Sequence, residues 1–199
     1  MPNWCCNVMK VSGPKEKVTQ FSEDCRSLDD DGEESVLSFA KIVPIPEWAE
    51  EEDWHSAHCF LWGTKWDAGE PFIENDEEWD DERELTYEFM TAWGPPCEFV
   101  MRAARKYPEL AFCLKWDEPG MDLVGRIRAA DGNVTEYQEL QAKPFDPVGP
   151  WLMLAAHLDH VLNKPDSREF YAKLDPLMEL PQPKDKHESV GSAGTALAV

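Results

Sequence analysis

The chain has 199 residues, of which 42% are hydrophobic and 11% aromatic, enough to build a core and to exclude wholesale disorder. Its 40 acidic residues against 19 basic ones give a net charge of −21, which excludes docking on nucleic acid or on an anionic membrane through the overall field. No apolar run approaches the roughly 20 residues of a spanning helix, and the N-terminal residues lack a basic, apolar signal region, so we expect a soluble, cytoplasmic protein.

The first part of the chain predicts a strand, a helix and the beginning of an acidic segment. Residues 4–12 alternate in polarity and predict a strand that ends at a Gly-Pro turn. Residues 15–25 carry apolar side chains at helical spacing and predict a helix. Residues 36–45 are apolar and β-branched but interrupted by prolines, so they predict a short extended segment. Residues 47–82 are acidic and rich in tryptophan, and they support no assignment.

The middle of the chain alternates strands with a second helix. Strands are predicted at residues 85–93, 110–117, 122–129 and 134–140, and a helix at 96–107. Two helices separated by strands, covering one face of an antiparallel sheet, are typical of the split βαβ arrangement. The predicted fold class is therefore α+β, a ferredoxin-like antiparallel sheet with two helices on one face. This domain should span residues 1–142, with an acidic insertion at about 29–84.

The remainder of the chain predicts an extension of that domain. Prolines at 144, 147 and 150 mark a linker, and the apolar spacing of Trp151, Leu154 and Leu158 predicts an amphipathic helix after it. Residues 143–180 are therefore predicted as a linker and helical extension. Residues 181–199 are rich in Pro, Gly, Ser and Ala and predict a disordered tail.

Four separated motifs resemble the YubB ferredoxin-like domain family of phage and plasmid proteins. They are an opening Pro-Asn-Trp-Cys, a WGTKWD motif, a TAWGPP motif and a WDEPG turn. The motif positions singled out are Trp4, Trp62, Gly63, Thr64, Lys65, Trp66, Asp67, Trp93, Pro95 and Pro96. The resemblance covers about residues 1–140. It implies a ferredoxin-like fold and a mobile-element origin, and it implies no catalytic residue and no cofactor.

The remaining candidates for metal or cofactor chemistry are sparse. The six cysteines form no CxxC pair and are read as reduced thiols. His55, His58 and Cys59 have a spacing that could hold zinc, but a structural site needs a fourth ligand at regular spacing. No glycine-rich phosphate loop or nucleophile motif is present. The sequence predicts no metal and no cofactor.

Negative charge is concentrated in one part of the chain. Between residues 29 and 88 there are 21 acidic residues against three basic ones, a net charge of −18, comparable to the phosphates of about nine base pairs of DNA. The densest part, taken as the candidate partner-binding site, comprises Glu74, Asp76, Glu77, Glu78, Trp79, Asp80, Asp81, Glu82 and Glu84. Two interpretations stay open, a solvated face that keeps the protein soluble and a binding surface that mimics nucleic acid.

The predicted function is that of a non-enzymatic interaction protein whose partner is a basic, nucleic-acid-binding host or defence protein. The alternatives are a small hydrolase using Lys65 and Asp67 as general acid and base, and a structural accessory protein. No nucleophile accompanies those two residues, and tryptophans beside a glycine more often pin a loop by burial. Direct RNA binding is disfavoured, because residues 110–117 offer only Lys115 and Trp116 to a base or phosphate.

Overall fold

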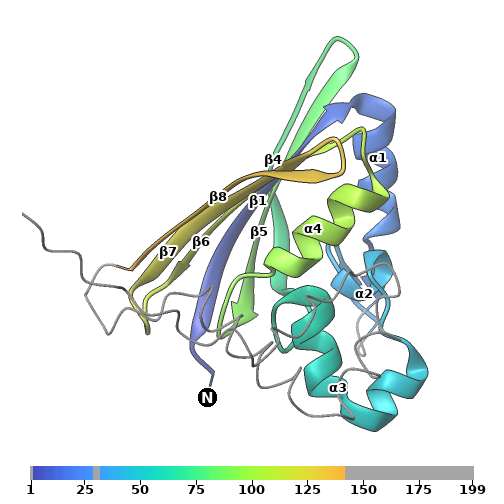
Figure 1. The fold of residues 1–199 in the computed structure, drawn as a ribbon. Coiled ribbons are helices and arrows are strands. Elements are labelled where there is room, and N and C mark those ends of the chain that lie inside the picture. Colours follow the sequence, from blue (N-terminus) through green and yellow to red (C-terminus); the bar gives the residue numbers. More distant parts are fainter. Residues whose placement is uncertain (1, 29–31, 142–199) are drawn as a thin grey trace, which may run out of the picture. The chain divides into compact units, whose positions relative to one another are not determined.

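The computed structural model describes residues 2–28 and 32–141. The elements are β1 (Trp4–Pro14), α1 (Lys15–Asp24), β2 (Ser27–Leu28), β3 (Glu34–Ser35), α2 (Phe39–Ile42), α3 (Glu47–Trp62), β4 (Gly69–Trp79), β5 (Glu82–Ala92), α4 (Cys97–Lys106), β6 (Ala111–Glu118), β7 (Leu123–Ala130) and β8 (Asn133–Gln141). Six of the strands form one antiparallel sheet in the order β4-β5-β1-β6-β7-β8 (Figure 1).

The sheet has the ferredoxin-like topology expected from the sequence. Strand β1 lies between β5 and β6 and pairs antiparallel with both. The chain order β1-α1-β4-β5-α4-β6 is the split βαβ pattern, which confirms the predicted α+β fold. Strands β7 and β8 continue the sheet beyond β6 as a meander, and β2 and β3 form a separate two-stranded ribbon.

Helices α1 and α4 cover one face of the sheet, and the core lies beneath them (Figure 1). The strands alternate accordingly: on β1, Cys5 and Met9 are buried, whereas Lys10 is exposed. Phe21 of α1 lies at the centre of an aromatic cluster, with its ring centroid 5.3 to 6.2 Å from those of Tyr87, Tyr107 and Phe112. Burial of each such side chain stabilises the fold by about 1.5–3 kcal/mol.

Two expectations for the acidic part of the chain, residues 29–88, need correction. The predicted extended segment at 36–45 is wrong, because residues 39–42 form α2, whose first N–H groups are capped by Asp67. The segment 29–84 was expected as one insertion, but β4 within it pairs with β5 and is one of the four strands of the βαββαβ pattern. The part of the chain that lies outside the βαββαβ pattern is therefore the stretch between α1 and β4, which contains α2 and α3.

The predicted linker and helical extension at 143–180 and the tail at 181–199 lie outside the described residues. Among the helices of the described part, none is long and apolar enough to cross a membrane.

Candidate functional site: the acidic β4–β5 hairpin

The densest run of acids, residues 74–84, forms the end of the β4–β5 hairpin, here called the acidic hairpin. Its strands pair from Asp76–Leu85 to Trp79–Glu82, and Asp80 and Asp81 make the turn. Asp80 has a φ of 50°, a left-handed conformation that Asp and Asn tolerate better than most residues. The local sequence therefore suits a tight turn, and it places its carboxylates in solvent.

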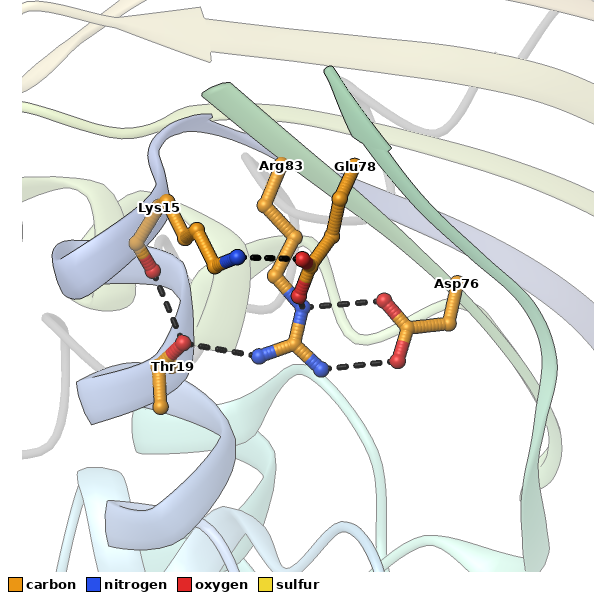
Figure 2. Close-up of polar contacts among 5 residues, drawn as sticks. All are labelled: Lys15, Thr19, Asp76, Glu78 and Arg83. Carbon is orange, nitrogen blue, oxygen red and sulfur yellow. Dashed lines mark hydrogen bonds and ion pairs between the residues drawn. The ribbon is translucent and has the colours of Figure 1, made fainter. Parts of the chain in front are cut away.

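Arg83 fastens the hairpin to α1, as Figure 2 shows. Its Nε and Nη2 donate to the two carboxylate oxygens of Asp76 at 2.9 and 2.7 Å, and its Nη1 donates to Oγ1 of Thr19 at 2.7 Å. Lys15 of α1 forms an ion pair with Glu78. The hydrogen bonds from Arg83 lower the pKa of Asp76, and the same contact raises the pKa of Arg83.

The eight acids of the hairpin are therefore not equivalent. Asp76 and Glu78 bind α1 and Arg83, and Glu84 accepts a hydrogen bond from Lys10 at 2.6 Å. The side chains of Glu74 and Glu77 are exposed on β4, and Glu77 accepts a hydrogen bond from Asn75 at 2.7 Å. The three acids at the tip, Asp80, Asp81 and Glu82, are exposed and have no ion pair within the described residues.

A hollow of about 430 Å³ opens beside the hairpin. Trp79, which is 47% exposed, is one of the residues that line it. Four acidic residues, Glu82, Glu84, Glu109 and Asp131, line the same hollow, and Glu84 and Glu109 also form ion pairs with Lys10 and Lys17. A face of an indole ring together with carboxylates is suited to an ammonium or guanidinium group.

The acids that the structure describes between residues 32 and 88 do not line one face. Glu50, Glu51 and Glu52 are exposed on α3, which lies at the end of the sheet opposite the hairpin tip (Figure 1). A continuous surface carrying all the net charge of that segment is thus not formed. The candidate site narrows to the hairpin and the hollow beside it.

The tryptophan motif, residues 62–67, lies at the end of β5 that is far from the hairpin tip, and it packs against the sheet there. Trp62 is buried and donates its indole N–H to the carbonyl of Val43 at 2.8 Å. Gly63 ends α3 with a φ of +83°, and Thr64 donates its hydroxyl to the carbonyl of Ala92 at 2.9 Å. These contacts pin the loop onto the sheet.

Lys65 and Asp67 have separate partners. Asp67 accepts four hydrogen bonds, from the hydroxyl of Ser38 at 2.7 Å and from the N–H groups of Phe39, Ala40 and Ala68 at 2.5, 3.3 and 2.7 Å. The ammonium of Lys65 lies over the rings of Trp66 and Trp54, 4.8 and 5.5 Å from their centroids. Within the described chain no hydrogen bond or ion pair joins the two residues, so the geometry gives the hydrolase alternative no support.

The sequence did not predict that its separated motifs would meet. The ring of Trp4 on β1 lies 6.0 Å from that of Trp66, and the N–H of Trp93 donates to the carbonyl of Asn3 at 2.9 Å. Pro95 and Pro96 lead into α4, and the carbonyl of Pro96 accepts the N–H of Val100. Only the pairing of β1 with β5 brings these positions together, so no local signal could have found the cluster.

The histidines of α3 are held by protein groups. The two ring nitrogens of His58 lie 2.8 Å from the carbonyl of Lys65 and 2.8 Å from a carboxylate oxygen of Glu50. His55 lies 3.9 Å from the sulfur of Cys59. No group of three or more potential metal ligands gathers in the part of the chain that the structure describes.

Comparison with known proteins supports the fold. Residues 62–144 match the family model described as the ferredoxin-like domain in Api92-like protein. The structure is similar to the crystal structure of a protein Api92 from Yersinia pseudotuberculosis, with a TM-score of 0.53 and 11% identity over 73% of this chain and 100% of that one. The search of curated proteins found no match. These similarities do not single out the YubB family, and they identify the chain as one that carries a ferredoxin-like domain similar to that of Api92-like proteins.

Proposed function

We propose that the protein is a non-enzymatic interaction protein of a phage or plasmid whose acidic hairpin binds a basic protein. The observation that carries this proposal is the hollow that Trp79 and four acidic residues line. A lysine or arginine side chain entering the hollow would lie against the indole ring and among carboxylates of β5, the loop before β6 and the β7–β8 turn. Exposed tryptophans of this kind are frequent anchors of protein interfaces.

The energetics favour a fast, salt-sensitive association. Each exposed ion pair contributes at most about 1 kcal/mol, so affinity would depend on the ring contact and on several pairs together. The field of the hairpin would steer a basic partner from a distance, and salt would screen that field over about 8 Å at physiological ionic strength.

The finer proposal is that the partner is a host or defence protein that binds nucleic acid, which the hairpin would block by mimicry. Residues 74–84 hold eight acids and Arg83, a net charge of −7, which matches the phosphates of roughly four base pairs. The hairpin would therefore occupy one phosphate-contact patch of the partner and leave the rest of its nucleic-acid site uncovered.

A pull-down from host lysate at low and high salt, with two matched triple variants, tests the proposal. One variant neutralises the hairpin tip (Asp80→Asn, Asp81→Asn, Glu82→Gln), and the other neutralises α3 (Glu47→Gln, Glu51→Gln, Glu52→Gln). Both remove three exposed charges. We expect a basic nucleic-acid-binding protein, identified by mass spectrometry, to be captured at low salt by the wild type and the α3 variant.

The hairpin variant should lose that partner, and Trp79→Ala should release it faster. Equal losses in both triple variants would show a response to net charge alone, and an unaffected capture would exclude the hairpin as the site.

A further inference from the structure

A second hollow, of about 350 Å³, lies next to the hollow that Trp79 lines. The two hollows share four lining residues, so they meet and form one trough. The shared residues are Ser12 on β1, Glu84 on β5, Ala111 on β6 and Ala130 on β7. Ser12 and Ala111 are cross-strand neighbours with small side chains. Small side chains at the junction leave room for a peptide chain to pass from one hollow into the other.

The two ends of the trough carry opposite charge. Among the described residues, and outside the shared ones, the first hollow is lined by three acids and no base, and the second by three bases and no acid. The acids are Glu82, Glu109 and Asp131, and the bases are Lys10, Lys115 and Arg128. We call these parts the acidic end and the basic end. The bases around the second hollow oppose the overall field of a chain whose net charge is −21.

Each end has at least one charged side chain without an ion pair in the part of the chain that the structure describes. These side chains are Glu82 and Asp131 at the acidic end and Lys115 at the basic end. Lys10 is bonded to Glu84 at 2.6 Å, and Nε of Arg128 lies 3.4 Å from a carboxylate oxygen of Glu136, with 45% and 52% of the two basic side chains exposed. Lys115 is therefore the base best placed to receive an anionic group.

The length of the trough sets the spacing of the groups that it can bind. Lys115 lies four positions along β6 from Ala111 at the junction, and Asp131 directly follows Ala130 on the other side of it. At about 3.3 Å for each residue of a strand, Lys115 is about 13 Å from the junction. An extended peptide spans this length in about four residues, with the side chains of its first and last positions on the same side.

We propose that the trough binds an extended segment of the partner that carries a lysine or arginine and, about four residues away, an aspartate or glutamate. The basic side chain enters the acidic end beside Trp79, and the carboxylate meets Lys115 at the basic end. This inference rests on the proposed function and specifies the partner of the same site. A segment that is basic throughout is disfavoured, because its further bases would face those of the basic end.

The overall charge of the chain gives the proposal a distinctive sign. A glutamate added to a basic peptide weakens the attraction of that peptide to a chain with a net charge of −21. The same glutamate strengthens binding only where bases gather locally, as they do at the basic end. One exposed ion pair corresponds to a change of up to about fivefold in the dissociation constant.

An NMR titration of the isotopically labelled full chain with synthetic peptides tests the proposal. Each peptide has blocked ends and one arginine in a Gly-Ser background, with either glutamate or glutamine four positions before or after the arginine. The arginine–glutamine peptides should shift the indole N–H signal of Trp79, which the Trp79→Phe variant identifies. One of the two arginine–glutamate peptides should bind about threefold more tightly than its glutamine counterpart, and it should also shift the amide signal of Lys115.

Lys115→Gln should remove the gain that glutamate provides. Lys41→Gln is the matched control and should keep the gain, because it removes one exposed base outside both hollows. The amide spectrum of each variant shows that it is folded. Glutamate peptides that bind no more tightly in either order, or a gain that persists in Lys115→Gln, would overturn this inference and leave the proposed function in place. Arginine peptides that leave Trp79 unshifted would contradict the proposed function, and this inference with it.

Discussion

Two regions at opposite ends of β5 use carboxylates in opposite ways. In the tryptophan motif, both oxygens of Asp67 are occupied by hydrogen bonds from one hydroxyl and three N–H groups. At the tip of the acidic hairpin, Asp80, Asp81 and Glu82 have no ion pair within the described residues. The difference teaches that a carboxylate saturated by the fold stabilises it, whereas one left in water remains available to a partner.

The largest effect is expected from removing the saturated carboxylate. Asp67→Ala leaves the first N–H groups of α2 without a cap, and we expect a loss of about 2–3 kcal/mol in the free energy of unfolding, measured in denaturant. Asp67→Asn keeps one acceptor oxygen and should cost less. Equal stability of wild type and Asp67→Ala would show that water replaces the cap at no cost.

The turn that precedes Lys65 should be the next most sensitive position. Gly63 has a φ of +83°, and a Cβ there would meet the side chain of Glu98 and the carbonyl of Pro95, the latter at 3.1 Å. Gly63→Ala should therefore cost about 1–2 kcal/mol. Gly94→Ala is the matched control, because a Cβ there has no atom within 4 Å, and it should be nearly neutral.

A smaller loss in the free energy of unfolding, of about 1 kcal/mol, is expected when the contact between the hairpin and α1 is removed. Arg83→Met removes the bidentate contact with Asp76 and the bond to Thr19. Because the pKa of folded Asp76 is lowered, its contribution is present above the ordinary value of about 3.9 and is lost as the pH falls through the lowered folded pKa.

The stabilities of wild type and Arg83→Met should accordingly converge in acid, as measured by thermal unfolding over a pH series. Asp76→Asn should show the same loss near neutral pH. A difference that stays constant with pH would assign the effect of Arg83 to its packing and to Thr19.

The smallest effect on stability is expected at the hairpin tip. The triple change Asp80→Asn, Asp81→Asn and Glu82→Gln should leave the free energy of unfolding within about 0.5 kcal/mol of the wild type or raise it slightly, because it relieves repulsion. A marked loss of stability would mean that these carboxylates are structural, and it would remove the contrast with Asp67.

Strands β1 and β5 to β8 and helices α1 and α4 could be predicted from local pattern, whereas α2, α3, β4 and the ribbon strands β2 and β3 could not. For β4 and α2 the physical reason is clear. Strand β4 carries exposed polar and charged side chains on both faces near its end, so it has no alternation to detect and is defined by its ladder with β5. Helix α2 is four residues long and is capped by Asp67 from 28 positions away. Neither signal is local.

The sequence by itself determined the alternation of β1, the amphipathic helices α1 and α4, the strands that follow α4 and the concentration of acids, because these depend only on neighbours in the chain. Only the tertiary structure decided which charged side chains have a hydrogen-bond or ion-pair partner within the protein. Lys10 reaches Glu84 across 74 positions, and Arg83 reaches Thr19 across 64. Whether a carboxylate supports the fold or faces water depends on donors that only strand pairing and helix packing bring within hydrogen-bond distance.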